Sequence, residues 1–397
     1  MTLPISNVKS ITDPRQIGVD AGGRTRTAHI TTLGDFKIVG ADRSLLIDSV
    51  GTGSGSFSNN KYIMSAPAGK YMIRQSHRFH PYFSGKSQIV ECTFYTFQPE
   101  AGVVKRVGYF SSNAAAPYAS NYDGFWLESG SGKITLKAAR DGVETLSVEA
   151  SAWNRFFPNT YDWSMFTVVM FDFLWLGGAV LRLWLKTDQG FVLCHEFNYS
   201  GTAKDTFTKS PSQPVRYEIR GTSGDGTLHY VCAQVATEGS TEESGSSRAV
   251  DTGSAAITLA AIGTRYPLKA IRKKTSQRDV GVRLTDLAVF ASTANDLYRW
   301  ELCLNPTLSA GLTYSDVSNS AIQEASGNGT ITVSNPGTVL SSGYMSTDIP
   351  LPVGLLKENY LSYLGSSILD VMDEMVLVIT PITGGVGMFG GITVKEY

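Results

Sequence analysis

The stretch that decides the fold covers residues 165–185 and reads MFTVVMFDFLWLGGAVLRLWL. Its length and apolar composition are typical of a membrane span. However, Gly177 and Gly178 interrupt it, and such a pair suits the positive φ angles of a two-residue hairpin turn. After the pair, leucines alternate with arginine, tryptophan and lysine, which is the pattern of a half-exposed strand. Asp172 and Arg182 would also be costly in lipid. The stretch therefore predicts a buried β-hairpin rather than a membrane helix.

Strand-like segments bounded by turn residues continue on both sides of this hairpin. They cover residues 88–97, 105–109, 124–128, 133–140, 144–149, 167–176, 179–186, 191–198, 215–221, 227–237 and 281–291. Alternating strands at such regular spacing are typical of an antiparallel sandwich, because each sheet buries one face against its partner. The expected fold class is therefore mainly β, an antiparallel β-sandwich.

The chain is expected to have three parts: an extended N-terminal arm over residues 1–65, the β-sandwich over 66–300 and a smaller β-rich C-terminal domain over 301–397. The arm ends in GTGSGSFSNN (51–60), which lacks the GK[ST] ending of a phosphate-binding loop and is interpreted as a flexible linker.

The C-terminal part carries three further local predictions. Residues 356–364 are expected to form a helix that turns at Gly365, and residues 375–380 a buried strand. The last ten residues, MFGGITVKEY, offer a strand that could pair either within the chain or with a neighbouring subunit.

Composition excludes several classes of function. The 34 basic and 35 acidic residues nearly cancel and only 17% of residues are charged, so direct nucleic-acid binding or attachment to an anionic membrane is not expected. The four cysteines are far apart without a CxxC pair, which favours free thiols over a zinc site or a disulfide scaffold. No secretory signal precedes the arm, so export by the standard route is not expected.

Candidate catalytic and metal-binding residues have ordinary structural explanations. No run of alternating carboxylates such as E-x-D-x-x-E, typical of sandwich glycosidases, occurs in the chain. Cys194 and His195 are adjacent on an expected strand and so point to opposite faces. His77 and His80 have a spacing that would hold a metal in a helix, but Pro81 indicates a loop. No enzymatic activity, cofactor or metal is therefore expected.

A sugar-binding groove is the alternative that the aromatic residues keep open. Asp123 and Gly124 are interpreted as a turn before an apolar strand. Several aromatic side chains near that turn or later in the chain have faces suited to stacking on a sugar, although aromatic residues in a β-protein more often pack in the core or at an interface. They are Tyr118, Tyr122, Trp126, Trp153 and Trp163.

Four segments resemble a family of structural proteins of tailed phages and large DNA viruses, over residues 75–345. They are RFHPYFSGKSQIVECTFYTF (78–97), KRVGYFSSNAAAPYASNYDGFWLESGSGKITL (105–136), FDFLWLGGAVLRLWL (171–185) and LYRWELCLNPTL (297–308). In the family a YxxGKS-like core precedes an R-V-G-Y-F-(D) element and a later DG element. Ser111 stands where the family tends to have Asp, and residues 113–120 are an insertion, so no ion or ligand contact is carried over.

The central segments also resemble jelly rolls of the concanavalin or laminin-G type, a fold that hosts lectins, glycosidases and scaffolding modules. The viral resemblance implies a virion structural protein, such as a minor capsid, decoration or assembly component, assembled in the host cytoplasm. Its expected partners are other virion proteins and further copies of itself, trimeric or higher, bound through apolar and aromatic surface. The residues expected to matter are Tyr109, Phe110, Asp123, Gly124 and Trp126 at the motif hairpin, and Arg299, Trp300, Asn305 and Pro306 at the domain junction.

Two other functions remain open at this point. One is a glycan-binding receptor module of a viral spike or fibre. The other is a sugar-cleaving enzyme, which would need two carboxylates about 5 to 10 Å apart in a cleft.

Overall fold

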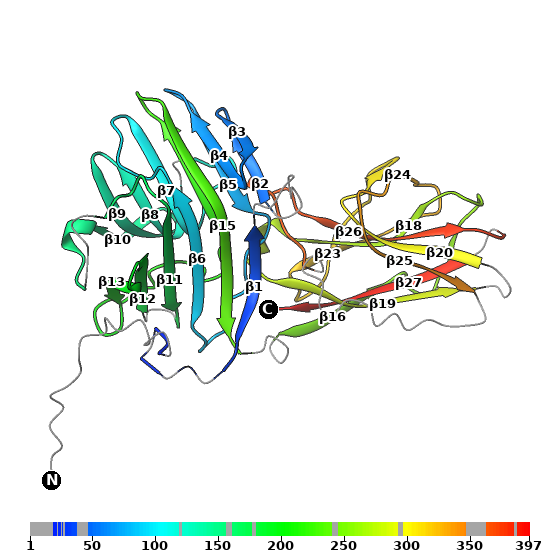
Figure 1. Ribbon diagram of the computed structural model, residues 1–397. Coiled ribbons are helices and arrows are strands. Elements are labelled where there is room, and N and C mark those ends of the chain that lie inside the picture. Colours follow the sequence, from blue (N-terminus) through cyan, green and yellow to red (C-terminus); the bar gives the residue numbers. More distant parts are fainter. Residues whose placement is uncertain are drawn as a thin grey trace, which may run out of the picture. The chain divides into compact units, whose positions relative to one another are not determined.

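The computed structural model describes residues 19–21, 23–24, 26, 28–37, 47–118, 121–155, 161–176, 180–239, 245–292, 297–346, 363–384 and 387–397. The chain forms two compact units that meet in sequence between Glu243 and Ser244, and both consist of antiparallel β-sheets (Figure 1). Within the described ranges, no helix is both long enough and apolar enough to cross a membrane.

The first unit is a sandwich of two large sheets. One has eight strands in the order β13-β12-β11-β6-β15-β4-β3, and β1 pairs with the part of β15 that β4 leaves free. Its strands are β1 (Ile30–Lys37), β3 (Ser54–Ser58), β4 (Lys61–Ala66), β6 (Gln88–Tyr95), β11 (Thr167–Leu174), β12 (Val180–Thr187), β13 (Gly190–Asn198) and β15 (Gly226–Glu238). The other sheet has seven strands in the order β10-β9-β8-β7-β14-β5-β2. They are β2 (Ile47–Gly51), β5 (Tyr71–Ser76), β7 (Val103–Ser111), β8 (Asp123–Gly130), β9 (Lys133–Arg140), β10 (Val143–Glu149) and β14 (Val215–Gly221).

Aromatic contacts between the two sheets define the core of this unit. Tyr217 on β14 stacks on Tyr230 on β15 with ring centroids 4.3 Å apart, and Phe125 on β8 meets Phe171 on β11 at 5.3 Å. Because successive residues of a strand point to opposite faces, the residues that alternate with Tyr217 and Phe125 lie on the outer face of the seven-stranded sheet. That outer face carries the candidate site described below.

The second unit is also built from antiparallel sheets around its own core. A six-stranded sheet has the order β22-β23-β18-β26-β20-β25, a four-stranded sheet has β27 between β19 and the pair β16 and β17, and β21 pairs with β24. Strands β16 (Ser246–Asp251), β17 (Ile257–Thr258), β18 (Tyr266–Lys273), β19 (Val282–Ala291), β20 (Leu297–Leu304) and β21 (Thr307–Leu308) come first in the chain. Strands β22 (Ser315–Asp316), β23 (Ile322–Ser326), β24 (Val333–Asn335), β25 (Thr338–Ser346), β26 (Glu374–Pro381) and β27 (Gly387–Glu396) follow.

The fold class and the deciding hairpin are confirmed. Strands β11 and β12 pair antiparallel with Asp172 opposite Arg182, while the turn predicted at residues 177–178 lies outside the described residues. Both charges have partners, since Asp172 pairs with Arg26 at 2.8 Å and Arg182 with Glu196 at 2.9 Å. These partners explain how a charged pair can occupy an otherwise apolar hairpin.

The predicted domain limits need correction at both ends of the sandwich. Residues 30–37 and 47–66 supply β1 to β4 to the two sheets, so much of the expected N-terminal arm is part of the sandwich. The segment expected to be a linker contains β3, an edge strand whose side chains are all exposed. Its polar composition reflects that exposure and does not exclude a strand.

The expected boundary near residue 300 moves to residues 243 and 244. Strands β16 and β19 pair with β27, and β18 and β20 pair with β26, so residues 246–304 belong with the C-terminal strands. Pairing over such long sequence separations leaves no local sequence signal. The unit boundary therefore could not be predicted from the periodicity of apolar residues.

Three C-terminal predictions have different outcomes. Residues 375–380 form most of β26, as predicted. MFGGITVKEY pairs within the chain, because β27 takes partners on both edges. The helix expected at 356–364 falls outside the described residues except at its end, where Tyr363 forms a bridge with Arg283.

Candidate functional site

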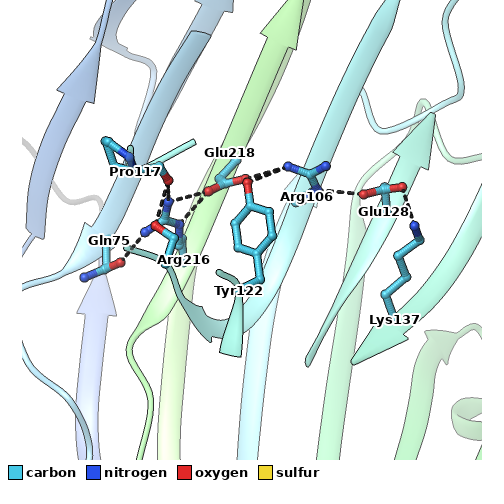
Figure 2. Close-up of polar contacts among 9 residues, drawn as sticks. Gln75, Arg106, Pro117, Tyr122, Glu128, Lys137, Arg216 and Glu218 are labelled. Carbon is cyan, nitrogen blue, oxygen red and sulfur yellow. Dashed lines mark hydrogen bonds and ion pairs between the residues drawn. The ribbon is translucent and has the colours of Figure 1, made fainter. Parts of the chain in front are cut away.

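Charged side chains form a continuous network across the outer face of the seven-stranded sheet. Figure 2 shows it running from Gln75 on β5 through Arg216 and Glu218 on β14 and Arg106 on β7 to Glu128 on β8. Arg216 and Glu218 are two positions apart on β14, and the other members face them in register, so the period of two along a strand places the whole network on one face.

Arg216 is the most buried member, with 1% of its side chain exposed. Its Nε donates to Glu218 Oε1 at 2.6 Å and its Nη1 to Gln75 Oε1 at 2.7 Å. Its Nη2 also donates to the carbonyl oxygen of Pro117, in the loop between β7 and β8. A buried guanidinium needs such partners, because an unpaired buried charge is strongly destabilising.

Arg106 joins the two glutamates of the network. Its Nε donates to Glu128 Oε2 at 2.6 Å, and its Nη1 donates to Glu218 Oε2 at 3.1 Å and to the Tyr122 hydroxyl at 2.8 Å. Burial lowers the pKa of Arg106, but the neighbouring tyrosines and glutamates outweigh burial and hold that pKa well above its ordinary value. Arg106 therefore stays charged at any physiological pH.

Lys137 on β9 closes the network at its far end. It lies 3.2 Å from Glu128 Oε1 and 3.2 Å from Glu144 Oε2. Burial raises the pKa of Glu128, but Arg106 and Lys137 outweigh burial and bring that pKa below its ordinary value. Glu128 is therefore ionised near neutral pH.

The loop between β7 and β8 covers part of this face. Ser112 Oγ donates to the Pro117 carbonyl oxygen at 2.7 Å, which accepts from Arg216 as well. Tyr118 of the same loop lies against Tyr71 with ring centroids 5.5 Å apart, and burial raises its pKa to about 12. The Tyr118 hydroxyl therefore stays protonated, and its ring remains partly exposed beside the network.

An apolar cluster lies on the same outer face, next to the charges. Phe110, Trp126 and Ala139 are buried there, and Tyr122 packs against them with its hydroxyl donating to Glu218 at 3.1 Å. Among the described residues, Trp126 Nε1 has no hydrogen-bond partner although the side chain is only 4% exposed. The face thus combines aromatic rings with fixed hydrogen-bonding groups.

The arrangement is better suited to binding than to acid–base catalysis. Glu218 and Glu128 lie on strands separated by β7, which places the strands roughly 10 Å apart. That spacing is near the range of inverting glycosidases, but a general acid needs a raised pKa. Arg106 contacts both glutamates, and the pKa of Glu128 is lowered. Glu128 is therefore poorly suited to protonating a leaving sugar.

The structure separates the residues predicted at the motif hairpin. Tyr109 faces the core, where its hydroxyl donates to the His80 carbonyl oxygen at 3.0 Å and accepts from Gln88. Phe110, Gly124 and Trp126 lie on the outer face, at or beside the apolar cluster.

The turn predicted at Asp123 and Gly124 is wrong, because these residues begin strand β8. The Asp123 carboxylate accepts hydrogen bonds from the backbone N–H groups of Lys209 at 2.7 Å and Ser210 at 3.0 Å. The hydrogen-bond acceptors of the Asp123 carboxylate are therefore occupied by donors distant in sequence, rather than by the backbone of a local turn. This explains why the Asp-Gly pair does not reverse the chain here.

The second predicted group lies wholly inside the second unit, not at a domain junction. Arg299 pairs with Glu301 at 2.8 Å, and Trp300 is 5% exposed in the core. Asn305 and Pro306 line a depression of about 400 Å³ that includes Arg272. The two predicted groups therefore belong to different units.

The other aromatic and titratable candidates are structural. Trp153 and Trp163 lie buried against each other, with ring centroids 6.5 Å apart. His80 is buried, and burial lowers its pKa to about 3, while burial raises the pKa of the Cys194 thiol to about 12. No group of three or more potential metal ligands occurs in the part of the chain that the structure describes.

Sequence reasoning missed the charged network, although a signal was present. Strand β14 reads VRYEIRG, in which Arg216, Glu218 and Arg220 recur at every second position. Three charged residues on one face of a buried-looking strand indicate a polar outer surface. The partners on β7 and β8 could not be assigned without the strand order.

No family model and no curated protein matches the chain. Solved structures with a similar fold include the carbohydrate recognition domain of Emp47p, which is 10% identical in sequence. The match covers 53% of this chain and 97% of that domain, with a TM-score of 0.36. A legume lectin-like domain from Entamoeba histolytica has 12% identity, covers 54% of this chain and 100% of its own, and has a TM-score of 0.35. A carbohydrate esterase from the Shiga toxin-encoding bacteriophage phi24B is 12% identical. The match covers 53% of this chain and 100% of the esterase structure, with a TM-score of 0.35. Both binding domains and an enzyme are thus among the similar folds, and identities this low assign no function.

Proposed function

We propose that the protein is a glycan-binding component of a virus particle and that the outer face of the seven-stranded sheet holds the glycan. The observation that carries this proposal is the group of partly exposed rings of Tyr71, Tyr118 and Tyr122 beside ion-paired side chains. A sugar presents an apolar ring face and a rim of hydroxyls, so it needs both an aromatic surface and fixed hydrogen-bonding groups.

The ion pairs support the proposal because they fix the polar groups before a ligand arrives. Arg106 is held by Glu128, Glu218 and Tyr122 together, and Lys137 by Glu128 and Glu144. A site whose donors are already oriented loses less conformational entropy on binding. Such a face would bind hydroxyl groups without rearrangement.

Membership of a virus particle is supported by the four sequence segments that resemble viral structural proteins.

A second role, attachment to other virion proteins, is supported by the four-stranded sheet of the second unit. Phe290 on β19 is 56% exposed there and lies beside Phe389 on β27, with ring centroids 6.3 Å apart. Exposed aromatic side chains on a sheet face are typical of protein interfaces. A homo-oligomer, trimeric or higher, stays a prediction.

A glycan array with the labelled full chain tests the proposal. We expect selective binding that Tyr118→Ala weakens by about fivefold or more, since stacking on an aromatic face contributes about 1 kcal/mol or more. Tyr344→Ala is the matched control, because Tyr344 is 64% exposed in the second unit. Circular dichroism would verify that both variants fold.

Two results would overturn the proposal. One is the absence of binding to any glycan at millimolar concentration. The other is equal loss of binding in Tyr118→Ala and Tyr344→Ala. The location is tested separately, by mass spectrometry of purified virus particles. We expect to detect the protein in them, and its absence would contradict this part of the proposal.

A further inference from the structure

We propose that the glycan is acidic and that Arg220 supplies the subsite for its carboxylate or sulfate group. This inference rests on the proposed function and specifies its ligand class.

Arg220 lies on the same outer face as the network, near its aromatic side chains. It follows Arg216 and Glu218 at alternate positions of β14 and stands opposite Tyr71 of β5 in register. Its guanidinium carbon is 5.2 Å from the ring centroid of Tyr118. The cation is therefore placed where Tyr71 and Tyr118 would meet a sugar ring.

Arg220 is the one cation of this network face without a carboxylate partner in the described ranges. Arg106, Arg216 and Lys137 are each ion-paired, whereas neither an ion pair nor a hydrogen bond is formed by the Arg220 side chain there. The carboxylates that pair with the other three cations are Glu128, Glu144 and Glu218, which leaves the positive charge of Arg220 without a carboxylate of its own in this network.

The chemistry of an arginine beside tyrosine rings fits an acidic sugar. A guanidinium can donate two parallel hydrogen bonds to a carboxylate or a sulfate, and its planar shape is favoured against an aromatic ring. Arg220 is partly exposed, so a ligand can reach it. A neutral sugar of the same shape would leave this charge unmatched, and the site should therefore discriminate by charge.

The test compares matched glycans that differ only in charge. The pairs are β-1,4-oligoglucuronates with cello-oligosaccharides, oligogalacturonates with their methyl esters, sulfated with desulfated galactans, and sialyllactose with lactose. In at least one pair we expect the acidic member to bind about tenfold more tightly, as a charge-assisted bidentate contact allows. Raised salt should reduce this preference, because an exposed charge pair is screened.

Substitutions then connect the preference to the residue. Arg220→Gln should abolish the preference and leave the affinity for the neutral member unchanged, while Arg220→Lys should retain part of it. Arg248→Gln is the control, since it removes the same charge from a partly exposed arginine of the second unit. It should leave the preference intact.

The outcomes separate this inference from the proposed function. Equal binding of both members of every pair, or a preference that survives Arg220→Gln, would overturn the acidic subsite. If neutral glycans alone bind and Tyr118→Ala abolishes that binding, the inference of an acidic subsite is wrong while the proposed function is supported. Failure of every glycan to bind would overturn both.

Discussion

The Asp123 carboxylate accepts a 2.6 Å hydrogen bond from Gln213 Nε2, and this contact ties the first residue of β8 to the segment before β14. The same carboxylate accepts from the backbone of Lys209 and Ser210. One side chain therefore orders a connection that lies more than eighty residues away in sequence.

Removal of this carboxylate should destabilise the first unit. Asp123→Ala leaves four donors without their acceptor, since the Asp141 N–H also donates to this carboxylate at 3.3 Å, and we expect the free energy of unfolding to fall by about 3 kcal/mol. Five of the six tryptophans precede residue 243, so fluorescence during denaturant unfolding reports mainly on this unit. Asp205→Ala is the control, because Asp205 is 71% exposed in its pair with Arg140, and an exposed ion pair contributes little, so a far smaller loss is expected. Equal losses in the two variants would contradict the assigned role.

Gly124 should resist substitution more strongly than another glycine with positive φ. Gly124 has φ +122°, and a Cβ there would lie 2.3 Å from the Tyr109 carbonyl oxygen. Gly132 has φ +77°, but a Cβ there would meet no atom within 4 Å. We expect Gly132→Ala to cost about 1 kcal/mol from backbone strain alone, and Gly124→Ala about 3 kcal/mol or more. The same fluorescence assay measures the free energy of unfolding of both variants. Similar losses in the two would contradict the prediction, because they would mean that the strands beside Gly124 move apart at little cost.

Burial of His80 should make stability depend on pH. The His80 pKa is lowered from 6.5 to about 3: burial is the main cause, the hydrogen bond with the Gln213 carbonyl oxygen partly opposes it, and the charge of Arg78 adds to it. Between these values the unfolded chain binds a proton that the folded chain does not, so stability falls as pH drops from 6.5 toward 3. The slope is up to about 1.4 kcal/mol per pH unit.

His80→Phe should flatten this slope, whereas substitution of the exposed His29 by Gln should leave it unchanged. Denaturant unfolding at pH 4.5, 5.5, 6.5 and 7.5 measures it. An unchanged slope in His80→Phe would assign the pH dependence to other groups.

Asn305 should be important for the second unit because of its side chain as well as its backbone. It has φ 52°, its Nδ2 donates to Asp373 Oδ1 at 2.7 Å, and its Oδ1 accepts from the Glu374 N–H at 2.8 Å. Asn319 has a similar φ of 51° but no hydrogen bond of its side chain in the described structure. Asn305→Ala should therefore cost about 1–2 kcal/mol more than Asn319→Ala. Hydrogen exchange of β20 and β26, followed by mass spectrometry, measures the difference, and equal protection would refute it.

Local pattern predicted most strands of the sandwich, because each hides one face and therefore alternates. The β11–β12 hairpin was predicted from its alternating leucines although its composition resembles a membrane span. Strand β3 was missed because a polar edge strand needs no apolar face. The unit boundary was missed because it depends on which distant strands pair with β26 and β27.

The candidate site was predictable only in part. Tyr118, Tyr122 and Trp126 were identified as possible sugar-stacking residues, and the structure brings them to one face, where Arg106 lies over both tyrosine rings. Arg106 and Glu218 were missed, since their contact depends on β7 and β14 being neighbours although 112 positions separate them. Sheet order, rather than residue type, decides which charges neutralise one another.

Strand β27 fixes the order in which the two units can be completed during synthesis. Strands β16, β17 and β19 all pair with it, so this sheet has no central strand until residues 387–396 have left the ribosome. The first unit draws its sheets from residues 30–238 and can close much earlier. Translation pauses before residue 387 would thus leave β16 and β19 without their partner strand, and unpaired strand edges favour aggregation.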